Sequence, residues 1–268
     1  MRRASLLGMC LCGMWLGVLT GCETSALGRS QLKLLPESQM DQMGVAAFNE
    51  ISQQTPVSSN SRKNTYVTCV ASAVTRALTG PAAATRWEVK VFEDANANAF
   101  ALPGGKIGVN TGLLDVARNQ DQLATVLGHE VAHVLAGHSN ERVSAALVKQ
   151  AGMSALEVMA DSTNPMHGQM LGLFGAGVEY GVLLPYGRAH ESEADLMGLD
   201  LMARAGFDPT QSVALWQNMA AAGAGQPPEF LSTHPSHSTR IRDLEGRMPQ
   251  ARELSESARK AGRRPSCS

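Results

Sequence analysis

The chain has 268 residues and a formal net charge of −1, from 23 basic and 24 acidic side chains. This balance excludes a nucleic-acid-binding surface built on excess Lys and Arg, and a polybasic membrane patch, as the dominant feature. Aromatic residues make up only 4% of the chain, while Ala, Gly and Met are frequent. The length is sufficient for one sizeable core, and the composition favours a mainly helical protein.

The first 21 residues have the pattern of an export signal. Arg2 and Arg3 precede an uncharged apolar run, Leu6 to Val18, which is too short to span a bilayer comfortably. The run ends in Leu19-Thr20-Gly21-Cys22, which resembles the lipobox of bacterial lipoproteins. An uncleaved anchor or an ordinary secretory peptide with a chance cysteine is the alternative.

The lipobox resemblance implies that the Cys22 thiol carries a diacylglycerol and that Cys22 becomes the new N-terminus. Glu23 follows where retention in the inner membrane usually uses Asp, so we expect an outer membrane lipoprotein that faces the periplasm. The expected organisation is a signal peptide over 1–21, a tether over 22–35 and a single domain over 36–268.

Two further cysteines would follow Cys22 in the processed chain, Cys69 and Cys267. In an oxidising periplasm two free thiols seldom persist. We therefore predict a Cys69–Cys267 disulfide that ties the C-terminal tail to the N-terminal part of the domain. Two unpaired buried cysteines are the alternative.

Apolar spacing predicts helices over 36–54 and 65–78, separated by a polar loop. Alternating and short apolar runs predict three strands, over 87–92, 98–102 and 106–110. This order suggests a short antiparallel sheet, and its exposed edge would accept an extended peptide as an added strand.

Asn119 and Gln122 form a capping box that predicts the start of the next helix, and Gly137 predicts its end. A long amphipathic helix is expected to follow over 140–160. The segment 164–187 is rich in Gly and Met, and it is too short and too interrupted for a transmembrane helix. We expect it to form a flexible cover.

The predicted helix contains His129, Glu130 and His133 in the spacing H-E-x-x-H. Two histidines four residues apart lie on one face of a helix, so both imidazoles can bind one zinc ion. Glu130 lies about 100° further round the helix, where it can act as general base on zinc-bound water. The alternative, a polar helix face with two satisfied histidines, has to bury three polar side chains in an otherwise apolar stretch.

The third ligand does not follow the metzincin pattern, because Ala136 and Ser139 occupy the positions of its Gly and His. His138 is out of register, and we interpret it as a polar residue at the helix end. A second helix, 188–206, offers Glu191 and Asp195, which are four residues apart and therefore on one face.

In a gluzincin arrangement, one carboxylate of that pair would complete the zinc shell, and the other would fix the tautomer of a ligand histidine. Glu193 has the same chemistry but is predicted to point elsewhere. A solvated acidic helix start is the alternative explanation for these carboxylates.

These motifs together resemble a known family. H-E-x-x-H, the later Glu191-Ser192-Glu193-Ala194-Asp195, Ser232-Thr233-His234-Pro235 and Arg240-Ile241 are similar to the zinc peptidase family of the CAAX prenyl protease and HtpX. The periplasmic lipoprotein branch, with its LoiP-like and BepA-like proteins, is the branch that the chain resembles. Gly187 stands where the family usually has serine, which weakens any role for that position.

The resemblance implies an α+β, mainly helical, gluzincin-type domain with a short antiparallel sheet beside the H-E-x-x-H helix. His234 is implied to lie near the metal, where it would stabilise an oxyanion or close the site as an extra ligand. The implied roles are zinc ligands for His129, His133 and Glu191, a general base for Glu130, and for Asp195 an acid that contacts a ligand histidine or donates a proton.

The function expected from these residues is a zinc endopeptidase, with one zinc ion per chain, that cleaves misfolded or stalled envelope proteins. Its partners would be unfolded or misassembled envelope proteins, the membrane through the lipid anchor, and the outer-membrane assembly machinery, but no nucleic acid. The alternative is a chaperone-like assembly lipoprotein with a latent zinc site. A purely structural zinc site is disfavoured, because such sites usually use four protein ligands without a spare glutamate.

Overall fold

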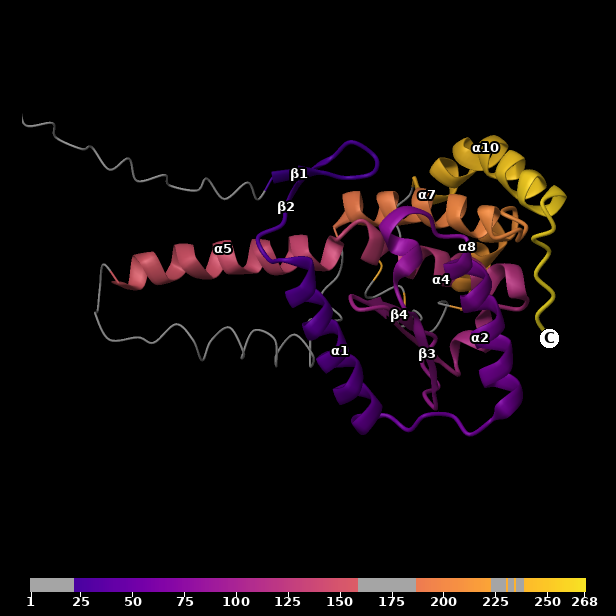
Figure 1. Cartoon of the computed structure of the whole chain (residues 1–268), viewed down its shortest axis with the longest axis horizontal. Helices are drawn as coiled ribbons and strands as arrows, with labels where there is room; N and C mark the ends of the chain where they lie inside the picture. Colours follow the sequence, from indigo (N-terminus) through magenta and orange to yellow (C-terminus); the bar gives the residue numbers. More distant parts are fainter. Residues whose placement is uncertain (1–21, 159–186, 223–229, 231–233, 235–238) are drawn as a thin grey trace, which may run out of the picture.

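The computed structural model describes residues 22–158, 187–222, 230, 234 and 239–268 (Figure 1). The predicted signal peptide and, apart from Gly187, the predicted cover lie outside this range. No helix in the described part of the chain is both long enough and apolar enough to cross a membrane.

The elements in chain order are β1 (Cys22–Thr24), β2 (Ser30–Leu32), α1 (Glu37–Gln54), α2 (Ser61–Arg76), η1 (Gly80–Ala84), β3 (Glu88–Phe92), β4 (Ala99–Leu102), β5 (Lys106–Asn110), α3 (Leu113–Val116), α4 (Gln120–Leu135), α5 (His138–Val158), α7 (Arg188–Arg204), α8 (Gln211–Ala222) and α10 (Arg240–Lys260).

Helix α4 is the centre of the fold, and every residue from Gln122 to His133 is buried. Figure 1 shows α7 lying along α4 and α10 covering the outer side of α7, while the strands lie on the other side of α4. Helix α2 packs against both α4 and β3. Because α4 is enclosed on all sides, its apolar residues form the main core with those of its neighbours, and its polar side chains must find partners inside the protein.

The sheet of β3, β4 and β5 is mixed, with the spatial order β3-β5-β4. Strands β4 and β5 form an antiparallel hairpin across the Gly104-Gly105 turn, whose two residues have positive φ angles of 78° and 72°. Strand β3 pairs with the far side of β5 and runs parallel to it. The prediction of a mainly helical α+β fold is confirmed, but the prediction of a purely antiparallel sheet is wrong for β3, because β5 and not β4 lies in the middle.

The ends of α4 are fixed by the predicted capping residues. The Asn119 side chain accepts a hydrogen bond from the Gln122 backbone N–H at 2.9 Å. The Gln122 side chain returns to the N–H of Arg118, one residue before the N-cap, at 2.9 Å. At the other end Gly137 has a φ of +69°, a left-handed conformation that suits glycine.

Two helix starts differ from the prediction. Helix α2 begins at Ser61, four residues before the predicted start, because the Asn60 side chain caps it by accepting from the N–H of Lys63 at 3.1 Å. Helix α5 begins at His138, directly after Gly137, so the chain turns from α4 into α5 without a loop.

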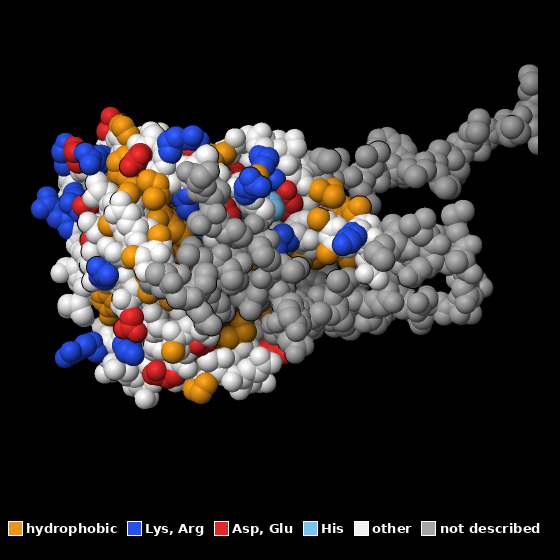
Figure 2. Space-filling view, turned by 180° about the vertical axis from the view of Figure 1, so that it is seen from behind, with side chains coloured by type: hydrophobic (Ala, Val, Ile, Leu, Met, Phe, Trp, Pro, Cys, Tyr) orange, Lys and Arg blue, Asp and Glu red, His pale blue; other side chains and the backbone are white. Residues whose placement is uncertain are grey.

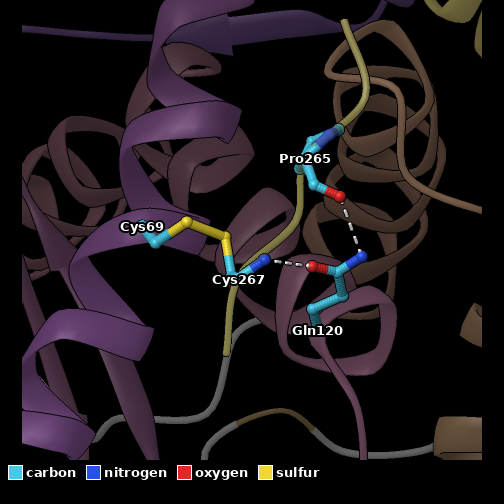
Figure 3. The surroundings of a disulfide bond; sticks show 4 residues. All are labelled: Cys69, Gln120, Pro265 and Cys267. Carbon is cyan, nitrogen blue, oxygen red and sulfur yellow. Dashed lines mark hydrogen bonds between the residues drawn. A yellow bond between two sulfur atoms is a disulfide. The ribbon is translucent and has the colours of Figure 1, made fainter.

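The predicted disulfide is present: Cys69 in α2 is bonded to Cys267 in the C-terminal tail (Figure 3). The Gln120 side chain at the start of α4 accepts from the Cys267 N–H at 2.8 Å and donates to the Pro265 carbonyl at 3.1 Å. The tail is thereby held against the first residue of α4 and the middle of α2.

The segment predicted to be a tether is folded. Strands β1 and β2 pair antiparallel, and residues 25–35, which we call the N-terminal arm, lie across the junction of α4 and α5 (Figure 1). The Gln31 side chain donates to the Ala136 carbonyl at 2.7 Å. The Asn140 side chain donates to the Leu35 carbonyl at 2.7 Å and accepts from its N–H at 3.3 Å.

Charges are interspersed on the surface. Figure 2 shows Lys and Arg side chains mixed with Asp and Glu over the described part of one face, where no extended basic patch is visible. This distribution agrees with the near-zero net charge of the chain.

Candidate metal centre

Helices α4 and α7 cross at a contact between two glycines. A Cβ atom on Gly198 would lie 2.7 Å from the backbone nitrogen of His129, and one on Gly128 would lie 2.7 Å from the carbonyl oxygen of Gly198. Any larger residue would therefore push the helices apart. This close approach brings the acidic side chains of α7 within reach of the histidines of α4.

Four buried side chains present donor atoms to one point: His129 and His133 of α4, Glu191 of α7, and His234, all four atoms within 4.8 Å of one another. Nε2 of His129 lies 3.0 Å from Nε2 of His133 and 3.2 Å from Nδ1 of His234. Nε2 of His133 lies 3.4 Å from a Glu191 oxygen. Four ligand atoms around a tetrahedral zinc ion lie about 3.3 Å apart, given Zn–N bonds of about 2.0–2.1 Å. The spacing therefore fits zinc.

The electrostatics of the cluster favour a cation. Burial opposes ionisation of Glu191, but its contacts with the imidazoles of His133 and His234 outweigh it and hold its pKa well below the ordinary value. Burial lowers the pKa of His133 well below its ordinary value, so its imidazole is neutral. Neutral imidazoles and an ionised carboxylate are the donors that zinc takes from nitrogen and oxygen ligands. The prediction of one zinc site in this chain agrees with this donor set.

Asp195 lies behind the cluster, one turn along α7 from Glu191. Its Oδ1 lies 3.0 Å from Nδ1 of His129, so the proton of that imidazole points outward and its Nε2 faces the other donors. Burial opposes ionisation of Asp195, but Arg240 and His129 lower its pKa. An imidazole held in this way by a carboxylate is common at metal ligands.

Arg240 is a site residue to which the sequence assigned no role. Its side chain is 2% exposed and donates to Asp195, and to Glu191 at 2.7 Å. The guanidinium lies 3.7 Å from the centre of the Trp216 ring. It balances two buried carboxylates that would otherwise repel each other. The signal was present in the Arg240-Ile241 motif, but its burial depends on how α10 covers α7.

Glu130 is buried beside the four donors. Its Oε1 lies 3.3 Å from Nε2 of His234 but makes no hydrogen bond within the described part of the chain. Burial raises the pKa of Glu130, although nearby His234, His129 and the backbone of Ala101 oppose the shift. A carboxylate whose pKa is raised by burial, and which has one unsatisfied oxygen, is suited to exchange a proton with a reacting water.

His138 and Glu193 also lie behind the donors, and neither was predicted to have a role at the site. His138, which we interpreted as a polar residue at the helix end, lies directly after Gly137 and is fully buried, and its Nδ1 lies 2.8 Å from Nδ1 of His133. Its Nε2 lies 3.1 Å from a Glu193 oxygen. Burial lowers the pKa of His138 to about 4, although Glu193 opposes the shift.

The structure thus brings His129, Glu130, His133, Glu191, Asp195 and His234 into one buried cluster. The other residues of the His234 motif, Ser232, Thr233 and Pro235, lie outside the described residues, as does the side chain of Cys22.

Comparisons with known proteins point to one family. The sequence profile of Peptidase family M48 matches residues 61–248, which is more than half of the chain. The mitochondrial metalloendopeptidase OMA1 of Schizosaccharomyces pombe is 40% identical over 168 residues, 62% of this chain and 48% of that protein. Human mitochondrial metalloendopeptidase OMA1 is 38% identical over 180 residues, 63% of this chain and 34% of that protein.

A bacterial relative is less similar. The beta-barrel assembly-enhancing protease of Escherichia coli is 29% identical over 164 residues, 59% of this chain and 33% of that protein. The chain spans about a third to a half of the length of these relatives. The resemblance to a zinc peptidase family is confirmed at the level of the family: the chain belongs to peptidase family M48.

Proposed function

We propose that the protein is a zinc endopeptidase in which His129, His133 and Glu191 hold the metal and Glu130 is the general base. One observation carries the proposal: a buried carboxylate with an unsatisfied oxygen lies beside donor atoms spaced for zinc. When bound, zinc would supply a Lewis acid that polarises a peptide carbonyl and lowers the pKa of water. A purely structural metal site has no use for Glu130.

Residues of the chain transfer the proton and position the ligands. Glu130 takes the proton of the attacking water and passes it to the amine that leaves. Asp195 keeps the proton of His129 on Nδ1, and Arg240 holds Asp195 and Glu191 in place. Of the two roles expected for Asp195 from the sequence, this proposal keeps the positioning of His129 and leaves out proton donation.

The edge of β4 is the proposed binding site for the substrate backbone. Asn98 pairs with Asn110 through a backbone hydrogen bond of 3.0 Å, so by alternation Ala99 and Ala101 turn their backbone groups away from β5. The backbone of Ala101 interacts with Glu130. A peptide added antiparallel to this edge would place a carbonyl near the metal cluster, without demands on the sequence of its side chains.

The proposed substrates are misfolded or stalled proteins of the bacterial envelope, and the proposed location is the periplasmic face of the outer membrane. The lipobox ending in Cys22 and the periplasm-compatible disulfide support this location. The name of the Escherichia coli relative, a protease that enhances beta-barrel assembly, supports a substrate or partner in envelope assembly. The membrane contact is through the lipid.

A second candidate function rests on His234. Its Nδ1 lies 3.2 Å from His129 and 3.0 Å from Glu191, in the position of a fourth donor, and its Nε2 faces Glu130. A fourth protein ligand would occupy the position that a catalytic zinc site keeps open for water. This placement favours a latent site, as expected for a chaperone-like assembly lipoprotein, over oxyanion stabilisation in the same arrangement.

The test is cleavage of unfolded casein by the purified full chain in detergent, with Glu130→Gln and His234→Ala alongside and zinc assayed in all three. The peptidase is supported if all three proteins hold one zinc per chain and the wild type cleaves casein while Glu130→Gln does not. If only His234→Ala cuts, the latent site is favoured. Absence of zinc from the wild type would overturn both candidates.

The location has its own test. Radiolabelled palmitate should label the wild type but not Cys22→Ser, and fractionation should find only the wild type with the outer membrane. Labelling of both proteins, or outer-membrane recovery of both, would contradict the lipid anchor.

A further inference from the structure

Behind His133 a line of hydrogen-bonding groups leads away from the metal cluster. Nδ1 of His133 lies 2.8 Å from Nδ1 of His138, and Nε2 of His138 lies 3.1 Å from a Glu193 oxygen. The same oxygen lies 3.1 Å from Nη2 of Arg29 and 3.2 Å from its Nε. His133, His138 and Glu193 are each no more than 4% exposed, so water does not substitute freely for these contacts.

The hydrogen bonds have one consistent direction. His133 turns Nε2 towards the other donors, and a nitrogen that binds a metal carries no proton, so the proton of His133 lies on Nδ1. His133 therefore donates to Nδ1 of His138, and the proton of His138 lies on Nε2, which donates to Glu193. The Glu193 carboxylate ends the line as an acceptor, and Arg29 donates to it.

Arg29 belongs to the N-terminal arm, which lies before the segment matched by the family profile, 61–248. It is shared between two carboxylates: two of its nitrogens lie 2.5 and 2.8 Å from the two oxygens of Glu141, in addition to its contacts with Glu193. The backbone N–H of Leu27 also points to Glu193, at 3.4 Å. The arm therefore supplies the outermost partners of the line.

We propose that the N-terminal arm is part of the support of the metal centre, with Arg29 holding Glu193, Glu193 holding His138, and His138 fixing the tautomer and ring orientation of His133. Arg29, Glu193 and His138 are positioning residues. The arrangement extends the usual pairing of a ligand histidine with a carboxylate by one imidazole, because Glu193 contacts His138 and His138 contacts His133. The inference rests on the proposed zinc peptidase function.

The experiment compares two glutamates that share Arg29. Glu193→Gln weakens the line to His133, whereas Glu141→Gln removes the charge of the other partner of Arg29, which also contacts His190, and changes no residue of that line. Zinc affinity is measured on the full chain by competition with a chelator, and the visible spectrum is recorded after loading with Co²⁺. Circular dichroism checks that each variant is folded, and Arg29→Ala and Arg29→Lys complete the series.

Loss of an outer partner typically weakens metal binding about 10–100-fold. We expect a loss at the lower end, about 10-fold, for Glu193→Gln and Arg29→Ala, each with a changed Co²⁺ spectrum. Arg29→Lys should recover most of the affinity, and Glu141→Gln should retain the wild-type spectrum. A merely structural role would change thermal stability but not the spectrum.

Two results would overturn the inference. One is wild-type affinity and spectrum in Glu193→Gln and Arg29→Ala while the wild type binds zinc and cleaves casein, which leaves the proposed function standing. The other is an equal loss in Glu141→Gln and Glu193→Gln, which would assign the effect to the charge of the arm and not to His138. A wild type without zinc would instead overturn the proposed function.

Discussion

The two ends of α4 are held by different kinds of contact. At its start Gln120 binds the C-terminal tail, which the disulfide from Cys267 joins covalently to α2. At its end the carbonyl of Ala136 accepts from Gln31 of the N-terminal arm, and the arm is held by hydrogen bonds and ion pairs. Segments from opposite ends of the chain therefore clamp the helix that carries His129 and His133.

Because of this difference, we expect the two ends of α4 to respond differently to reductant, salt and pH. A disulfide stabilises mainly by restricting the unfolded chain, so its contribution at the start of α4 responds to reductant and hardly to salt or pH. Ion pairs that are partly exposed respond to both. Between the two ends, the glycine contact with α7 depends on shape alone, and it is this middle part that sets the geometry of the metal cluster.

The largest expected effect is at the start of α4. Replacing Cys69 and Cys267 together by Ala should lower the free energy of unfolding by about 2–5 kcal/mol, because the bridge closes a loop with a sequence separation of 198. Urea unfolding measures this, and treatment of the wild type with reductant should reproduce it. Zinc content in native buffer should stay at the wild-type level; its loss would show that the tail also shapes the site.

The middle of α4 comes next. Gly198→Ala should cost about 1–3 kcal/mol, because the added Cβ meets the backbone of His129, which cannot move aside. Zinc binding should fall with it, since the ligands of α4 and α7 separate. Gly246→Ala in α10 is the matched control: nothing lies within 4 Å of its Cβ, so it should be neutral or stabilising by up to about 1 kcal/mol. Equal effects of both variants would argue against the contact.

A smaller effect is expected at the end of α4. Gln31→Leu removes the hydrogen bond to the Ala136 carbonyl, and its contact with Glu141 at 3.1 Å, at a cost of about 1 kcal/mol. Gln54→Leu is the control, because Gln54 lies exposed at the end of α1. A melting temperature of Gln54→Leu below that of Gln31→Leu would contradict the clamp at this end.

The smallest effect is a dependence on pH. Burial opposes ionisation of Glu141, but Arg29 and His190 lower its pKa to about 2. A carboxyl whose pKa is lower in the folded state stabilises above its unfolded value of about 4.3, and this contribution disappears as the pH falls towards 2. The melting temperature of the wild type should exceed that of Glu141→Gln at pH 7, and the gap should close below pH 4. A gap that is constant with pH would contradict the ion pair.

Local signals were sufficient for much of the secondary structure. The Asn119 cap, the left-handed Gly137 and the spacing of His129 and His133 depend on residues a few positions apart, so the sequence could predict them. The sheet order was not predictable in this way, because a strand direction does not say which neighbour it joins. The N-terminal arm was missed because its partners in α5 and α7 lie more than 100 residues away.

The sequence by itself therefore determined that α4 presents His129, Glu130 and His133, that α7 is acidic, and that two cysteines are available to pair. The spacing of the acidic residues left open which side chain of α7 meets which histidine, and tertiary structure decided it. The glycine crossing sets Glu191 against the donors and Asp195 against His129, and turns Glu193 towards His138. The reason is physical: side-chain spacing along a helix is local, whereas the rotation of one helix against another is fixed only by packing.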